Sequence, residues 1–358
     1  MGKLAVYKYV AMMFLVLQLI VSAYTFLGLF GGDVNPAGNM ARAMVVYILP
    51  ILIVINFLLL IYWLVRKRWF FAILPVVTIA CCIPYIGTVV QFGSVNEKPA
   101  SPQAKELVVA TYNVARFNRE TSGFLSQDIL AEMKRQKVDV FCIQEFMENS
   151  GDHNNVESYK EYFPYVANAG RDCVIFSRYP IKKTKPFLFE DSNQAGMYSD
   201  INVGGQTIRV FCVHLESTGI NRTIYKAGKL EMQGHEVQTN RVLDAVYGNY
   251  TLGMLFRASQ ANMLAQEIRS TTTPVIVCGD FNDVPYSYVY KTMLGNLVDG
   301  FKECGGGGWM GTYRGKKSVR IDYIFHSEAL KGTSYYKADL TYSDHYPVFL
   351  RMEYPGNK

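Results

Sequence analysis

The sequence predicts an α/β domain, in which helices cover a β-sheet, preceded by three membrane-spanning helices. Two observations lead to this fold class. Three long apolar segments stand near the start of a chain of 358 residues, half of which are apolar. From about residue 107, short β-rich apolar runs alternate with segments of helical spacing, which is the pattern of a sheet covered by helices.

Three segments contain no Asp, Glu, Lys or Arg: 9–32, 43–65 and 69–96. Each reaches the roughly 20 residues that a helix needs to cross a bilayer. The alternative is a signal peptide followed by buried core helices. A signal peptide, however, has one short apolar stretch and a cleavage site. We therefore expect an integral membrane protein whose first partner is the lipid bilayer.

Basic residues predict the orientation of these spans. The "RKR" stretch at 66–68 lies between the second and third spans, and Lys3 and Lys8 precede the first. The loop between the first two spans carries only Asp33 and Arg42. The positive-inside rule places the basic ends in the cytoplasm. Residues after about 97 are then extracytoplasmic, which in a bacterium means the periplasmic side of the inner membrane. Cleavage or failed insertion of the first span would reverse this orientation.

Composition divides the chain into a membrane anchor (1–97), a polar linker (98–106) and a second domain (107–358). Residues 1–98 hold seven basic and two acidic side chains, and the remainder holds 29 basic and 28 acidic ones. The second domain is therefore nearly neutral. It lacks the basic composition of many nucleic-acid binders, although a local basic patch is still compatible with this balance.

The cysteines indicate neither a disulfide framework nor a zinc site. Their number is odd, and the second domain has no CxxC spacing. Four of them stand in short apolar, strand-like runs: Cys142, Cys173, Cys212 and Cys278. We expect these four to behave as small buried hydrophobic residues.

Apolar runs and turn residues predict the elements of the second domain. Strands are expected at 107–114, 138–145, 172–177, 274–281, 320–325 and 346–354. Residues 201–215 predict a hairpin that turns at Gly204–Gly205. Residues 125–137 and 255–270 have the spacing of helices.

Polar residues able to do chemistry stand at the ends of these strands. They are Asn113, Glu145, His214, Asp280, Asn282, Asp322, Asp344 and His345. Asn and Asp favour turns, which accounts for any one of them. It accounts poorly for a Glu, three Asp, two His and two Asn at successive strand ends. Strands of a common sheet can bring such residues to one edge.

These residue types together suit one kind of reaction. Carboxylate and amide oxygens without thiolates form a hard-oxygen environment for Mg²⁺ or Mn²⁺. An Asp from one motif can orient a His from another. Two imidazoles and a metal ion supply the activated water, the charge neutralisation and the protonated leaving group that phosphodiester hydrolysis needs.

Seven motifs occur in an order that resembles the endonuclease/exonuclease/phosphatase superfamily: "TYNV", "IQE", "DCVIFSRYPI", "VHLES", "GDFND", "RIDYIF" and "SDHYPV". The resemblance covers roughly 105–355. It implies a four-layered α/β sandwich, with two packed β-sheets flanked by helices and the site at one edge. It also implies that 107–358 is a catalytic domain and a Mg²⁺- or Mn²⁺-dependent phosphoric ester hydrolase.

The resemblance implies a metal site and a water-positioning pair. Glu145 resembles the main metal ligand, with Asn113 beside it and Asp344 in or near the metal shell. Asp280 and Asn282 resemble the pair that orients the attacking water and contacts the phosphoryl group.

The resemblance also implies two histidine roles. His345 resembles the catalytic histidine, held by Asp322. His214 resembles a second histidine of the deoxyribonuclease and sphingomyelinase branches, with a phosphate-contacting or structural role as the alternative. Ala115 is a departure, because apurinic endonucleases carry an acidic residue there.

The substrate stays open among several classes. Inositol-phosphate 5-phosphatases carry a "CDR" segment where this chain reads "VRIDYIF", which argues against that class. A nuclease and a lipid phosphodiesterase remain, and the membrane anchor favours the lipid. A catalytically inactive binding module is a further alternative, although every motif residue is retained. Residues 217–254 follow the His214 motif and mix Tyr, Arg, Lys and Met, which suits either a membrane surface or a polyanion.

Overall fold

A computed structural model describes residues 3–93, 105–117, 126–146, 157–168, 172–190, 192–233, 238–314, 318–340 and 343–354. Most of the predicted linker, 98–106, lies outside these residues. The chain forms two compact units, which are described separately: Met1–Thr88 with Val284–Lys291, and Val89–Asp283 with Thr292–Lys358. The predicted domain boundaries remain a prediction.

The first unit consists mainly of three long helices, α1 (Lys3–Leu29), α3 (Leu49–Val65) and α4 (Trp69–Ile86). Short elements connect the first two: η1 (Gly31–Asp33), α2 (Met40–Met44) and η2 (Val45–Ile48). Three helical stretches are long and apolar enough to cross a membrane: Val6–Leu29, Met40–Val65 and Trp69–Ile86.

The helix of the third apolar segment ends before the uncharged run does. The helix α4 ends at Ile86, and Val90–Gln91 forms the short strand β1. A run of uncharged residues specifies burial or membrane contact, but it does not specify where a helix stops.

A polar network holds the three long helices together. Asn56 of α3 accepts hydrogen bonds from Gln18 and Ser22 of α1, each at 3.1 Å, and donates to Thr25 at 2.8 Å. Thr78 of α4 donates to Ser22 at 3.2 Å. All five side chains are buried. Interhelical hydrogen bonds of this kind contribute to helix association in lipid, where burial of apolar surface cannot.

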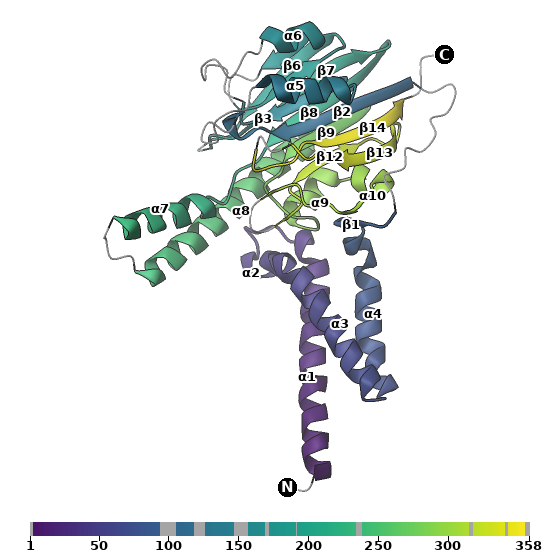
Figure 1. Ribbon diagram of the computed structural model, residues 1–358, viewed down its shortest axis with the longest axis vertical. Helices are drawn as coiled ribbons and strands as arrows, with labels where there is room; N and C mark the ends of the chain where they lie inside the picture. The colour runs from purple at the N-terminus through teal and green to yellow at the C-terminus, as the bar shows by residue number, and fades with distance from the viewer. Residues whose placement is uncertain are drawn as a thin grey trace. The chain divides into compact units, whose positions relative to one another are not determined.

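The second unit contains two six-stranded sheets (Figure 1). The first sheet has the order β10 (Val298–Asp299), β12 (Asp322–His326), β9 (Val275–Asp280), β8 (Gln206–His214), β7 (Ala195–Val203), β6 (Ile181–Leu188). The second sheet has the order β13 (Lys331–Lys337), β14 (Val348–Tyr354), β2 (Lys105–Asn113), β3 (Val140–Gln144), β5 (Val174–Ser177), β4 (Tyr165–Asn168). The strand β1 pairs with β11 (Gly308–Trp309).

The remaining described elements are helical: η3 (Ala115–Phe117), α5 (Ser126–Arg135), α6 (Glu157–Tyr162), α7 (Ile220–Met232), α8 (Thr239–Arg269), α9 (Tyr288–Leu294) and α10 (Gly300–Cys304). Both sheets are mixed. The pairs β2–β3 and β8–β9 are parallel, and the other neighbouring pairs are antiparallel.

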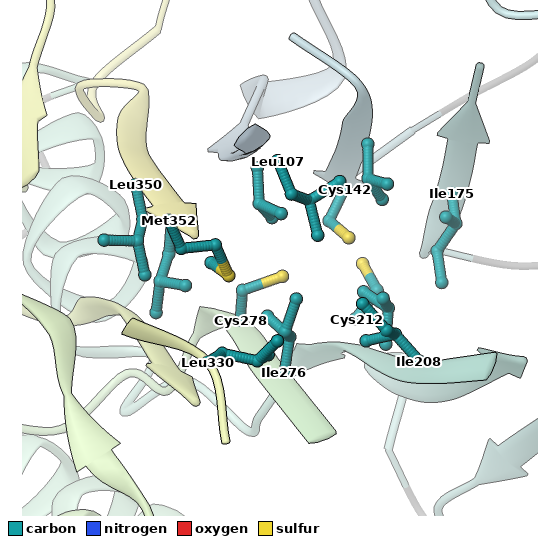
Figure 2. Close-up of a cluster of buried hydrophobic side chains, with 14 of the residues drawn as sticks. Leu107, Cys142, Ile175, Ile208, Cys212, Ile276, Cys278, Leu330, Leu350 and Met352 are labelled. Atoms are coloured by element: carbon teal, nitrogen blue, oxygen red, sulfur yellow. The ribbon is translucent and has the colours of Figure 1, made fainter. Parts of the chain in front are cut away.

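The inner faces of the two sheets pack into one core. Figure 2 shows Cys142 of the second sheet facing Cys212 and Cys278 of the first, among Leu, Ile and Met side chains. Cys173 belongs to the same cluster, and all seven cysteines are free thiols. The four strand cysteines are fully buried, as the apolar runs around them predicted.

Helices cover the outer faces of the sheets. Ile129 and Met133 of α5 and Tyr159 of α6 pack with Phe141 and Phe176 on the outside of the second sheet. The C-terminal half of α8 covers the first sheet, where Glu267 pairs with Lys185 of β6 at 2.6 Å. The domain is therefore the four-layered α/β sandwich that the resemblance implied.

Several elements escaped prediction, and the edge strand β6 shows why. Its sequence, "IKKTKPFL", is mostly exposed and carries three lysines. Charged residues on an edge strand oppose pairing with other chains, but they remove the alternation that identifies a strand. The predicted hairpin turn at Gly204–Gly205 is confirmed, since β7 ends at Val203 and β8 begins at Gln206.

Candidate functional site

The strand pairing brings the chemically active residues to one edge of the sandwich. In the first sheet, His214 at the end of β8 is in register with Asp280 at the end of β9. Asp322 begins the antiparallel strand β12 and is also opposite Asp280. In the second sheet, Asn113 ends β2 beside Gln144, and Glu145 follows directly.

Local backbone geometry fixes how two of these strands end. Gly279 has φ of 140°, and a Cβ there would lie 1.9 Å from the carbonyl oxygen of Val213 on β8. Only glycine allows this approach of β9 to β8 just before Asp280. Glu145 and Asn282 have φ of 54° and 51° without being glycine. Such strain costs about 1–3 kcal/mol per residue and concentrates at functional sites.

His345 is held by a carboxylate from another strand. Its Nδ1 lies 2.9 Å from Oδ2 of Asp322. Both side chains are buried, and the backbone N–H of Asp322 donates to Thr312 at 3.0 Å. The second ring nitrogen, Nε2, therefore faces away from Asp322, and it lies 3.7 Å from Oδ2 of Asp280.

His214 has a matching arrangement. Its Nδ1 lies 2.5 Å from Oδ2 of Asp172, and its Nε2 lies 3.7 Å from the same Oδ2 of Asp280. The other oxygen of Asp172 accepts the backbone N–H of Glu145 at 3.1 Å. Asp172 thus connects the second histidine to the residue that resembles the main metal ligand.

Asp280 is the centre of the site. One of its carboxylate oxygens accepts the backbone N–H of Asn282 at 2.8 Å, and the other accepts Nδ2 of Asn113 at 3.1 Å. This second oxygen also faces both imidazoles. The amide of Asn282 donates to the carbonyl oxygen of Leu215 at 2.9 Å, which fixes the loop after β9 against the loop after β8.

The buried charges shift one another's protonation. Burial opposes the charged imidazolium, but Asp322 and Asp280 outweigh it and raise the pKa of His345 to about 10. In the same way, Asp172, Asp280 and Glu145 outweigh burial and raise the pKa of His214 to about 9. Burial raises the pKa of Asp280 to about 6, against the lowering effect of the two imidazolium groups.

Asn113 joins the carboxylates of the two sheets. Its Nδ2 donates to Oε1 of Glu145 at 3.2 Å as well as to Asp280, and its Oδ1 accepts the backbone N–H of Ala115 at 3.0 Å. Glu145 is partly exposed, and its other oxygen lies 3.9 Å from Nε of Arg116. The carboxylates of Glu145 and Asp280 therefore lie on either side of one amide group.

Asp344 lies apart from this arrangement. Its side chain is exposed, and Oδ1 lies 3.4 Å from the Ser343 hydroxyl. The Ser343 hydroxyl donates at 2.7 Å to the backbone carbonyl of Asn113. The loop before His345 is thus tied to the end of β2, while the Asp344 carboxylate points into solvent.

A family model confirms what the motifs indicated. Residues 110–345 match the endonuclease/exonuclease/phosphatase family, which is more than half of the chain. The chain belongs to the endonuclease/exonuclease/phosphatase family. Members of this family hydrolyse phosphoesters. Residues 11–89 match a domain of unknown function, DUF8431. No curated protein sequence matches the chain.

Solved structures of the family share the fold. The truncated TDP2 of Caenorhabditis elegans has a TM-score of 0.51 and 14% identity, and the match covers 69% of this chain and 97% of that one. An endonuclease/exonuclease/phosphatase from Bacteroides vulgatus has a TM-score of 0.50 and 15% identity, over 70% and 99% of the two chains. At such identities the likeness describes the fold and leaves the substrate undetermined.

Family enzymes typically use a divalent metal ion, and the residues present fit one. Within the described residues, ligand atoms of Asp280, Asp322 and His345 all lie within 4.8 Å of one another. Oδ1 of Asp322 is buried and has no hydrogen-bond partner in the described part of the chain. The ring nitrogen of His345 nearest to Asp322 is already used in their hydrogen bond. The ligand atoms that remain for a metal ion are therefore carboxylate oxygens, such as those of Glu145. Carboxylate oxygens suit a hard cation.

The structure brings seven of the eight predicted residues to one edge and leaves the Asp344 side chain outside. Their roles remain predictions. Sequence reasoning missed Asp172, although the motif "DCVIFSRYPI" begins with it. Asp172 precedes the strand β5, as Asp322 begins β12, and this position at the start of a strand was the signal that could have identified it. Because β5 is antiparallel to β3, the start of β5 lies at the same edge as the end of β3.

Proposed function

We propose that the protein is a membrane-anchored, metal-dependent phosphodiesterase whose substrate is a lipid that carries a phosphodiester head group. One observation carries the chemical part. Two buried imidazoles, each paired with its own carboxylate, direct Nε2 at the same oxygen of Asp280. A phosphoester held at this point has proton donors on two sides and a carboxylate that can orient a water molecule.

The residues divide the work as follows. Asp280 and Asn282 position the attacking water. His345, oriented by Asp322, transfers the proton, and His214 contacts the phosphoryl oxygens. Because imidazolium is the favoured form of both rings, they can offset the negative charge that develops on the phosphoryl group.

A divalent cation, Mg²⁺ or Mn²⁺, belongs beside these groups. Glu145 and Asn113 would hold it, with Asp280 as a further oxygen donor. When bound, the ion supplies charge neutralisation and lowers the pKa of a bound water. The protein residues supply its position and the protons.

Two observations favour a lipid over bulk nucleic acid. The chain carries three helices that are apolar enough to span a bilayer, and the rest of it is nearly neutral. Nucleic-acid binding needs cations in number, because phosphate contacts supply most of the affinity. A nuclease is the competing function, and it would need a local basic patch.

A phosphodiesterase screen tests the proposal. The full chain, purified in nanodiscs with Mg²⁺, is incubated with sphingomyelin, phosphatidylinositol, plasmid DNA and an abasic duplex. Hydrolysis of a lipid, abolished by EDTA and by the His345→Ala substitution, supports the proposal. Cleavage of DNA alone would replace the lipid by a nucleic acid, and no hydrolysis of any phosphoester would favour a binding module.

A further inference from the structure

Two helices extend from the domain beside the active site. The helices α7 and the N-terminal half of α8 run next to each other away from the sheets (Figure 1). We call this pair the hairpin. Ile220, the first residue of α7, follows His214 by only six positions. The hairpin therefore begins a short distance in sequence after the active-site residue His214.

The base of the hairpin is tied to the catalytic loops. Arg257 of α8 is buried and donates to the backbone carbonyl of Glu216 at 2.9 Å, and its Nε lies 3.5 Å from Asp283. Gly253 packs so closely that an added Cβ would lie 3.0 Å from the carbonyl oxygen of Ser217. The loops after His214 and after Asn282 thus share a rigid attachment to α8.

The outer part of the hairpin exposes large apolar side chains. Six of them define what we call the hairpin face: Ile224, Tyr225, Leu230, Met232, Leu243 and Tyr247. Tyr225 is 72% exposed and Met232 is 83% exposed. Isolated exposed apolar residues are ordinary, but a concentration of them on two adjacent helices marks an interaction surface.

Two lysines of α7 lie on the side opposite Ile224. At 100° per residue, Lys226 is about 200° around the helix from Ile224, and Lys229 is about 140° from it. Both lysines are exposed. Tyr225 and Leu230 border the lysines, each about 40° around the helix from one of them. Lysines opposite one apolar residue and next to others are found in helices that lie in the membrane interface, where their long side chains reach the head groups. Tyrosine in particular is enriched at that depth.

A bilayer fits this surface better than other partners. The same chain carries three helices apolar enough to span a membrane, so the hairpin is covalently linked to helices that can hold it near a bilayer. Among the hairpin residues whose exposure the structure describes, the exposed cations are Lys226, Lys229 and Arg241 and the exposed acids are Glu231 and Asp244, a balance that suits anionic head groups. A nucleic acid would meet aliphatic side chains where it needs cations.

We propose that the hairpin face docks into the head-group region of an anionic phospholipid bilayer and presents the active site to lipids there. The docking is independent of catalysis, and only the presentation of substrate rests on the proposed function. In this proposal the hairpin is a second attachment to the membrane, in addition to the spanning helices. It orients the active site toward the lipid surface.

Matched labels on opposite sides of α7 test the docking. The full chain is reconstituted in phosphatidylcholine and phosphatidylglycerol vesicles with the exposed Cys81 replaced by Ala. An environment-sensitive fluorophore is attached through Ile224→Cys or through Lys226→Cys, and lipids with a nitroxide on the acyl chain serve as quenchers. We expect blue-shifted emission and several-fold stronger quenching at position 224 than at position 226.

Two results would overturn the docking. One is water-like emission and equally weak quenching at both positions. The other is a position 224 that is shielded from water but not quenched by lipid nitroxides, which would mean that protein, such as a second copy of the chain, covers the face.

An activity measurement separates this inference from the proposed function. Leu243→Ser should raise the KM for lipid in vesicles several-fold and leave kcat for a soluble aryl phosphodiester unchanged. Lipid hydrolysis without nitroxide quenching at position 224 would contradict the docking and support the proposed function. Quenching without hydrolysis of any lipid would keep the docking and remove the lipid substrate.

Discussion

His345 donates the hydrogen bond of its Nδ1 to Asp322, 23 residues away in sequence, and not to its neighbour Asp344. Nδ1 and Oδ2 are 2.9 Å apart, and both groups are buried. The Asp344 side chain is exposed. Successive residues of an extended segment point to opposite sides, so an adjacent Asp and His seldom pair. Asp322 therefore sets the orientation of the ring, and the two residues act as one unit.

The unit predicts non-additive kinetics. His345→Ala should lower kcat by roughly 10²-fold or more, as expected for a lost general acid–base. Asp322→Asn should cost less, because the ring remains with its orientation weakened. The double variant should be little worse than His345→Ala alone. Losses that multiply in the double variant, measured with a soluble phosphodiester, would show that the residues act independently.

Asp172 should matter as much to His214 as Asp322 does to His345. Asp172→Asn keeps an oxygen for the backbone N–H of Glu145 but loses the charge that favours the imidazolium form of His214. We expect kcat to fall about 10- to 100-fold, and the loss to be largely absent in a His214→Ala background.

A matched variant controls for stability. Asp200→Asn weakens the ion pair that Asp200 of β7 forms with Arg209 of β8. This pair lies at the end of the two strands that is remote from His214. Activity should stay at the wild-type level in this variant. Full activity in Asp172→Asn would show that His214 does not need Asp172 for its role in the reaction.

The sequence predicted the site where a simple rule held. Residues that end parallel strands meet at one sheet edge, and this rule found Asn113, His214 and Asp280. Antiparallel strands reverse the rule, because their first residues share that edge. Asp322 was identified from its position at the start of a strand, whereas Asp172, which also precedes a strand, was not.

The hairpin shows a different limit. Only 255–270 was predicted as helix, yet α8 begins at Thr239. The C-terminal half buries apolar residues against a sheet, so its periodicity follows the core. The N-terminal half exposes apolar residues such as Leu243 and Tyr247. Because these apolar residues do not pack on the core, their spacing does not show the periodicity by which a core-facing helix is recognised.

Hydrolysis should depend on Mg²⁺ or Mn²⁺. EDTA should abolish activity, and either ion should restore it. Glu145→Ala should raise the metal concentration needed for half-maximal activity by about 10-fold or more, since even residues that only orient ligands contribute 10- to 100-fold. Glu328→Ala, in an exposed turn, is the control. Full activity in chelator would exclude the metal site.

The basic residues of the second loop should control the topology. With "RKR" at 66–68 in the cytoplasm, a phosphatase reporter fused at the C-terminus should be active only after export. Gln at all three positions, combined with three lysines added to the loop near Arg42, should move the reporter to the other side. Strong signal from the unaltered chain with a reporter that works only in the cytoplasm would overturn the orientation.

The stability of the metal-free domain should fall as pH rises. The folded pKa of His345, about 10, exceeds its ordinary value of 6.5, so folding favours the protonated ring. This stabilisation is complete below pH 6.5 and is lost as pH rises through 10. His214, with a folded pKa of about 9, has the same sign. Folding also favours the protonated form of Asp280, whose pKa is raised to about 6 from 3.8. The contribution of Asp280 to folding stability is therefore lost as pH rises from 3.8 to 6, below the range of the two histidines.

Thermal unfolding of the full chain in nanodiscs with EDTA measures this dependence. Tm should be lower at pH 9 than at pH 7, and the drop should be smaller in His345→Gln, which has no ring to titrate. Comparing the two drops removes the contribution of titrating groups that do not interact with His345, because those groups titrate alike in both proteins. An equal drop in wild type and His345→Gln would mean that the Asp322–His345 pair does not stabilise the charged ring. Asp322 would then orient the ring of His345 without favouring its protonated form.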